Sequence, residues 1–167
     1  MSSIDTTNYD SHFWPEFRDR QRKLLEEIEN VGMAVSSDIG ARNDVHPRNK
    51  KAVGRRLARW ALKNEYGQNI LVSGPLPEKA VYKDGSIIVD FKYPGKGLKT
   101  SEGESLKGFS FDGKSEISAI AKGDKILIET SEMPEFIYYN WQPWATGNLI
   151  NSDGLPASTF KMKIVKK

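Results

Sequence analysis

The spacing of hydrophobic residues changes character once along the chain, between Gly67 and Pro77. Before this point apolar residues recur at the spacing of amphipathic helices. After it, short runs rich in β-favouring residues alternate with glycine, proline and aspartate. The pattern therefore predicts a helix-containing segment over residues 1–72 and a separate β domain over residues 73–167.

The first predicted helix begins at Trp14-Pro15-Glu16, because proline is tolerated at an early helical position where its missing N–H has no cost. A stripe typical of a one-sided helix, apolar except for Gln21, follows at helical spacing: Phe17, Gln21, Leu24, Leu25 and Ile28. Gly32 stands where a C′ glycine would end the helix.

A short strand is predicted at Met33–Ser37, so that Asp38 lies at its carboxyl end. After a loop, a second helix is expected from Pro47 to Tyr66-Gly67. One face of this helix is apolar and carries Val53, Leu57, Trp60 and Ala61, whereas Arg55, Arg56, Arg59 and Lys63 occupy the other sides. Helix, strand and helix in this order are typical of an α/β unit.

The β domain is predicted from turn signals. Asp84-Gly85 separates Lys79–Tyr82 from Ser86–Phe91 and indicates a hairpin. Further expected strands are Leu106–Phe111, Glu116–Ala121, Lys125–Thr130, Phe136–Trp141 and Thr159–Val165. Several short strands with glycine and proline in the gaps favour an antiparallel β-sandwich of jelly-roll type.

The first segment is too short to be a doubly wound domain by itself, because such a sheet normally needs about four or more strands. We therefore interpret residues 1–72 as the C-terminal end of a larger α/β domain. Residues 73–167 are interpreted as an accessory β-sandwich domain behind it.

Composition narrows the classes of function. The 167 residues carry a formal net charge of +3, and the densest basic patch is Arg48–Lys63, so a nucleic-acid partner is not expected. The chain has no cysteine, which excludes disulfides, thiolate metal sites and a cysteine nucleophile. No cofactor or metal site is predicted, and no apolar run reaches the roughly 18 residues of a membrane span.

The loop between the predicted strand and the second helix holds the candidate chemistry. In open α/β sheets, ligands and catalytic groups gather at such strand-to-helix corners. The loop carries Asp38, Asp44 and His46, and an imidazole beside a carboxylate is two thirds of a hydrolytic triad. His46 would be the general base and Asp44 its acid partner, with Asp38 as the alternative acid. His46 could instead be a polar cap, and Asp44 a capping or dipole partner of the second helix.

Several segments together resemble the C-terminal part of the sialate O-acetylesterases, which are carbohydrate esterases of the SGNH/GDSL hydrolase superfamily. They are Trp14-Pro15-Glu16-Phe17-Arg18, Gly32-Met33-Ala34-Val35, Asp38-Ile39-Gly40, Asn43-Asp44-Val45-His46-Pro47-Arg48-Asn49-Lys50, Val53-Gly54-Arg55-Arg56-Leu57-Ala58, Tyr66-Gly67, Ser73-Gly74-Pro75, Trp141, Asn148-Leu149 and Gly154-Leu155-Pro156-Ala157. The superfamily more often has the acid three residues before the histidine, and Asn43 stands at that position here.

The resemblance implies a serine esterase that removes O-acetyl groups from sialic acid or related glycans. It also implies a secreted or periplasmic protein. The family's nucleophilic serine lies in a Gly-Asp/Gln-Ser block that this chain lacks, and G-x-S-x-G is absent too. The serine is thus expected from an upstream catalytic domain, and this chain alone is expected to be inactive.

Other functions remain open from the residues alone. The chain could be a non-catalytic carbohydrate-binding or interdomain structural β-sandwich module. An aromatic segment that could stack on a sugar contains Tyr138, Tyr139, Trp141 and Trp144. Packing is nevertheless the commoner role of such side chains. The basic second helix could bind nucleic acid, but its apolar stripe argues against this.

Overall fold

The structure is a computed structural model that describes residues 11–44, 46 and 48–167. It contains two α-helices, α1 (Trp14–Glu27) and α2 (Lys50–Asn64), followed by nine strands. The strands are β1 (Leu76–Lys83), β2 (Ser86–Lys92), β3 (Lys99–Thr100), β4 (Phe109–Ser110), β5 (Ile120–Lys122), β6 (Lys125–Glu129), β7 (Phe136–Tyr139), β8 (Leu149–Ile150) and β9 (Phe160–Lys166). Single 3₁₀ turns, Ser11–Phe13 and Ser101–Gly103, precede α1 and follow β3.

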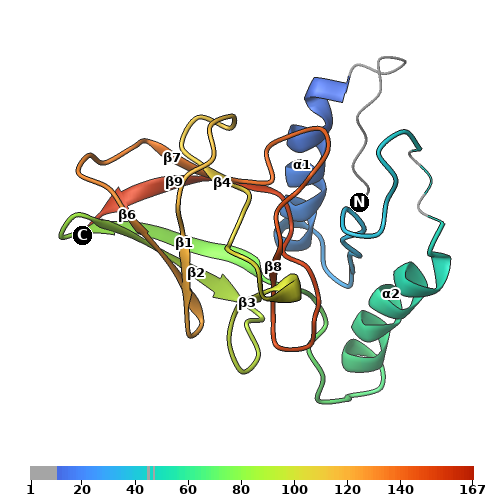
Figure 1. The fold of residues 1–167 in the computed structure, drawn as a ribbon. Helices are drawn as coiled ribbons and strands as arrows, with labels where there is room; N and C mark the ends of the chain where they lie inside the picture. The colour runs from blue at the N-terminus through green and yellow to red at the C-terminus, as the bar shows by residue number, and fades with distance from the viewer. Residues whose placement is uncertain (1–10, 45, 47) are drawn as a thin grey trace.

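Seven strands form one curled, mixed sheet in the order β4-β7-β9-β1-β2-β6-β5 (Figure 1). All its pairs are antiparallel except β1 with β9, which is parallel and pairs Ala80 with Ile164. The predicted hairpin is confirmed, since β1 and β2 pair through to Lys83 opposite Ser86 around Asp84-Gly85. Strands β3 and β8 form a separate two-stranded sheet that the sequence pattern did not predict.

The expected antiparallel jelly-roll sandwich needs correction. The described residues form a curled half-barrel sheet beside a small second sheet, and no clear pair of facing sheets. The curled sheet can enclose a core by itself, because side chains on its inner face meet one another across the curve. The buried apolar cluster includes Ile87, Val89, Phe109, Ile126, Ile128, Ile137, Tyr139, Phe160 and Ile164.

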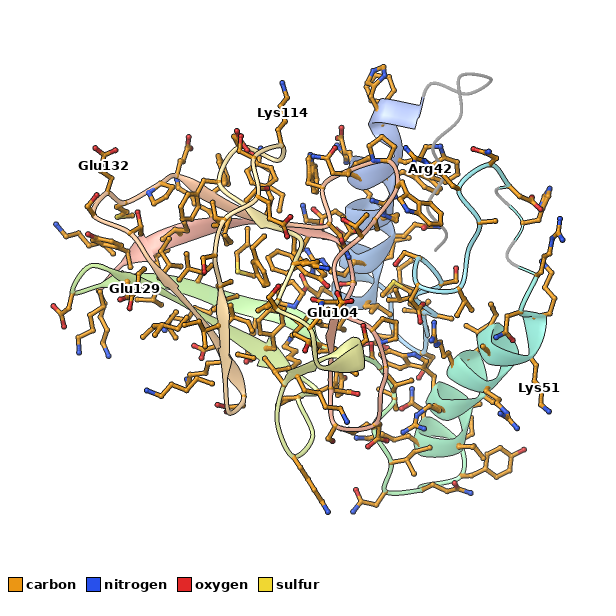
Figure 2. The ribbon with its side chains drawn as sticks, in the orientation of Figure 1. Arg42, Lys51, Glu104, Lys114, Glu129 and Glu132 are labelled. Carbon is orange, nitrogen blue, oxygen red and sulfur yellow. The ribbon has the colours of Figure 1, made fainter. Side chains whose placement is uncertain are left out.

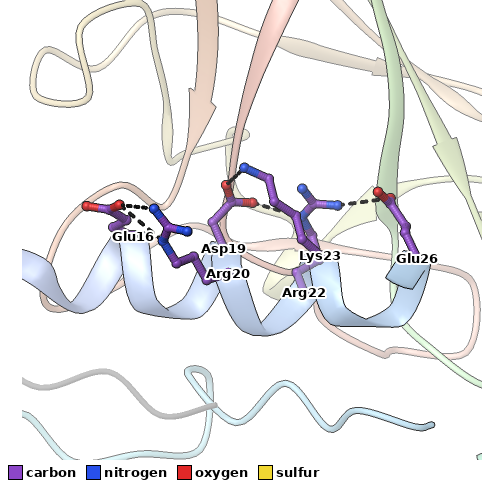
Figure 3. Close-up of polar contacts among 6 residues, drawn as sticks. All are labelled: Glu16, Asp19, Arg20, Arg22, Lys23 and Glu26. Atoms are coloured by element: carbon purple, nitrogen blue, oxygen red, sulfur yellow. Dashed lines mark hydrogen bonds and ion pairs between the residues drawn. The ribbon is translucent and has the colours of Figure 1, made fainter. Parts of the chain in front are cut away.

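Helix α1 begins as predicted, with Pro15 in its first turn, but its orientation is unexpected. Its buried residues are Pro15, Arg18, Asp19 and Arg22. The apolar stripe instead points outward, so α1 packs on the sheet through its polar face. Figure 3 shows the ion pairs along this helix, in which Asp19 accepts from both Arg22 and Lys23.

Helix α1 ends at Glu27, earlier than Gly32 predicted, because the backbone becomes extended at Ile28, with a φ of −119° and a ψ of 128°. Gly32 has a different role: a Cβ there would lie 2.6 Å from the Cγ of Trp60. The strand predicted at Met33–Ser37 is not formed. Residues 34–37 are buried, but no ladder of strand pairing joins them to another described segment, and a strand requires such a ladder.

Helix α2 begins at Lys50, where the side chain of Asn49 accepts a hydrogen bond from the amide of Ala52 at 3.0 Å. The predicted start at Pro47 lies outside the described residues. The predicted closure is confirmed, since Gly67 takes a φ of 64° and its amide bonds back to the carbonyl of Lys63. No residue of α2 is buried.

Candidate active site

The loop after Ser37 leads from a buried segment to α2, and its described part is folded into two tight turns (Figure 1). The amide of Ile39 donates to the carbonyl of Ser36 at 3.3 Å, and the amide of Asp44 donates to the carbonyl of Ala41 at 3.3 Å. These turns set the positions of the three predicted site residues, which are all at least partly open to solvent.

His46, the predicted base, is exposed to solvent. Its backbone amide donates to Oδ1 of Asp44 at 2.9 Å. Among the described residues, its imidazole is hydrogen-bonded neither to a carboxylate nor to a serine hydroxyl. The structure therefore holds His46 in place through its main chain rather than through its ring.

Asp44 forms this short loop contact and a longer one. Its second oxygen lies 3.9 Å from Nε of Arg48, and about a third of its side chain is exposed. Asp44 does not cap α2, since Asn49 takes that role. Its carboxylate, two residues before His46, is therefore paired only weakly with a cation.

Asp38 is engaged much more tightly, by a residue of α2. Both of its oxygens accept from Arg56, at 2.7 Å each, and Arg56 also donates to the carbonyl of Val35 at 2.6 Å. Such a bidentate pair fixes the orientation of the carboxylate. Asp38 is thus directed toward Arg56 and ties the start of the loop to α2.

Arg56 is the residue that sequence reasoning missed, because it was only placed, with Arg55 and Arg59, on the sides of the second helix away from its apolar face. Arg59 is also engaged: it donates to the carbonyl of Leu71 at 2.5 Å and pairs with Asp153. The basic side chains that do project outward include Lys51 (Figure 2). Spacing along α2 alone gave no signal that separated the engaged arginines from the solvated cations.

The aromatic segment after β6 is mostly used in packing. Tyr139 is fully buried, its hydroxyl accepts from the amide of Leu149 at 2.9 Å, and burial raises its pKa. Tyr138 meets Trp141 edge to face, and the ammonium of Lys161 lies 4.1 Å above the ring of Phe136. The contacts of Tyr138, Tyr139 and Trp141 therefore favour packing over a sugar platform for these three side chains.

Neither a membrane helix nor a metal cluster is found in the part of the chain that the structure describes. None of its helices has the length and apolarity needed to cross a bilayer. Within the same residues, no three side chains of histidine, aspartate or glutamate converge as metal ligands would.

Comparison with known proteins supports an esterase fold. The structure superimposes on XAC1771, a carbohydrate acetylesterase from Xanthomonas citri, with a TM-score of 0.83 and 29% sequence identity. The match covers 97% of this chain and 39% of that chain, so this chain spans well under half the length of the matched protein. No protein-family description matches the sequence, and no curated protein matches it either.

Proposed function

We propose that this chain is one part of a carbohydrate acetylesterase, which hydrolyses O-acetyl esters on a glycan. The observation that carries the proposal is the superposition on XAC1771 over nearly the whole chain. Sialic acid is the sugar favoured by the sequence motifs. The histidine-bearing loop supports the reaction class, because ester hydrolysis at neutral pH needs a base of imidazole type near the nucleophile.

In the proposed mechanism His46 accepts the proton of a serine hydroxyl while the serine oxygen attacks the acetyl carbonyl. The tetrahedral intermediate collapses when His46 returns that proton to the departing sugar oxygen, leaving an acetyl-serine. Water then attacks the acetyl group while His46 takes its proton, and His46 returns that proton to the serine oxygen as the ester bond breaks, which restores the serine hydroxyl and releases acetate. The serine is proposed to come from polypeptide outside these residues.

Asp44 is the proposed acid partner of His46. Two observations support it over Asp38: its oxygen already binds the backbone of His46, and Arg56 occupies both oxygens of Asp38. An acid that orients the imidazole needs an oxygen free to accept from the ring. In this proposal Asp38 positions the loop by holding α2, and it does not touch the reacting atoms.

A chimaera tests the proposal. This chain replaces the corresponding part of XAC1771, and release of acetate is measured from an aryl acetate and from O-acetylated sialic acid. We expect hydrolysis by the chimaera, a loss of about 10⁴-fold or more in His46→Ala, and little change in the exposed control Lys114→Ala. Hydrolysis by this chain alone that disappears in His46→Ala would contradict the proposed external serine.

The substitutions Asp44→Asn and Asp38→Asn, made in the same chimaera, distinguish the roles of the two carboxylates. Asp44→Asn is expected to lower kcat by about 10³-fold or more with the fold intact. Asp38→Asn is expected to have the smaller effect on kcat. The reverse order of effects would assign the acid to Asp38.

A further inference from the structure

Both helices expose large apolar side chains, and on α1 these lie on the face turned away from the sheet. The exposed fractions are 51% for Phe17, 41% for Leu24, 52% for Ile28 and 46% for Leu57. On α1 this exposure accompanies the burial of charged residues on the opposite side of the helix. An amphipathic helix normally buries its apolar face, so the exposed stripe indicates a missing contact.

Two of these side chains, Leu24 of α1 and Leu57 of α2, line one groove. It lies between α1 and α2 over the segment that joins Val31 to Ala34, and its volume is about 300 Å³. Its apolar lining comes from Leu24, Leu25, Val31, Met33, Val53 and Leu57. Gln21 is the one lining residue with a polar side chain, which leaves no set of convergent polar groups to orient a small ligand.

We propose that this groove and the helix faces beside it, Phe17, Leu24, Ile28 and Leu57, are the docking surface for the remaining α/β part of the acetylesterase. The inference rests on the proposed function for the identity of that part, which would carry the serine. Two helices that present apolar faces across one buried segment resemble an α/β layer whose sheet is incomplete. Most of the XAC1771 chain lies outside the match, and a part of comparable size could occupy this surface.

Docking in this groove would also bring the partner close to the segment that leads to the candidate active site. The groove is lined by Met33 and Ala34, and the same segment continues through Ser37 to the loop of Asp44 and His46. A domain seated in the groove would therefore lie against the segment from which the loop departs. The apolar character of the surface fits a permanent contact, since obligate interfaces resemble a domain core.

The test uses two separate chains. This chain is mixed with the part of XAC1771 that lies outside the match, and binding is followed by analytical ultracentrifugation and titration calorimetry. The corresponding segment of XAC1771 is the positive control that shows the other chain to be competent. We expect a one-to-one complex that Leu24→Asp and Leu57→Asp each weaken by about tenfold or more. Ile120→Asp is the matched control, because Ile120 is 56% exposed on the edge strand β5 and should leave binding unchanged.

Binding and hydrolysis separate the two proposals. A complex that is weakened by the two groove variants, but hydrolyses no aryl acetate, supports the docking surface and contradicts the proposed function. Hydrolysis with equal binding by all three variants contradicts the docking surface alone. No complex while the positive control binds, or self-association of this chain through Leu24 and Leu57, would overturn the inference.

Discussion

Arg18 shows how a single residue joins a helix to the sheet domain. It is 1% exposed, and its guanidinium donates to Oγ1 of Thr159 at 2.8 Å and to carbonyls of the chain after β7. These carbonyls belong to Asn140, Gln142 and Pro143, at 2.9, 2.5 and 3.1 Å. Burial lowers the pKa of Arg18 to about 10, so the group is still charged at neutral pH. The bound oxygens replace the water that the cation loses.

Replacing Arg18 by methionine is expected to lower the free energy of unfolding by about 3 kcal/mol, because buried oxygens would lose their donors. Urea unfolding followed by circular dichroism measures this change. Arg20→Met is the control, since the pair of Arg20 with Glu16 is mostly exposed and should contribute about 0.5 kcal/mol or less. Equal effects of the two substitutions on the free energy of unfolding would show that the contacts of Arg18 do not hold α1 to the sheet.

Two segments far apart in the sequence, Ser73-Gly74 and Leu155-Pro156, pack on each other. A Cβ at Gly74 would lie 2.0 Å from the carbonyl oxygen of Pro156, so the two backbones touch there. Asn151, which is fully buried, fixes the same junction by donating to the carbonyls of Ser73 and Tyr93, at 2.9 Å each. Its own oxygen accepts from the amide of Leu155 at 3.0 Å. The junction thus links the segment after α2 to the turn after β8.

Gly74→Ala is expected to destabilise the protein by about 3 kcal/mol, because backbone atoms on both sides would have to move. Gly54→Ala offers a matched control within α2, where a Cβ would meet no atom within 4 Å. That substitution should stabilise the protein by about 0.5 to 1 kcal/mol through helix propensity. Thermal melting of both variants gives the comparison, and a Gly74→Ala variant as stable as the parent would contradict the close packing.

Sequence patterns predicted the elements that depend on neighbouring residues. The hairpin at Asp84-Gly85, the start of α1 and the end of α2 at Gly67 all follow from local turn and capping chemistry. The parallel pairing of β1 with β9 did not, because it joins segments about 80 residues apart whose contact no local signal encodes. Periodicity also showed that α1 is amphipathic without showing which face meets the sheet.

The candidate site likewise has features that the sequence predicted and features that depend on the tertiary structure. The loop of Asp38, Asp44 and His46 was found from residue types and their spacing, and their catalytic roles stay predictions. The bond of Asp38 to Arg56 joins residues 18 positions apart on different segments. It depends on the angle at which α2 returns toward Val35, which the sequence pattern does not specify.

For the whole molecule, the structure indicates unequal stability. The sheet has a continuous buried core, whereas no residue of α2 is buried. Helix α2 is held mainly by polar and ring contacts: Trp60 donates to the carbonyl of Met33 at 2.9 Å and meets the ring of Tyr93, and Arg59 pairs with Asp153. A helix attached in this way can open while the sheet stays folded.

Hydrogen exchange monitored by NMR should therefore find the amides of α2 less protected than those of β2 and β6. Asp153→Asn removes a partly exposed ion pair, which is worth about 1 kcal/mol or less, so the exchange of α2 amides should rise by up to about fivefold. Asp90→Asn is the matched control, since it removes a carboxylate that pairs with Lys125 within the sheet. It should leave α2 unchanged. If Asp153→Asn instead accelerated α2, β2 and β6 equally, the helix and the sheet would unfold as one unit, and the proposed docking surface would already be rigid before any partner binds.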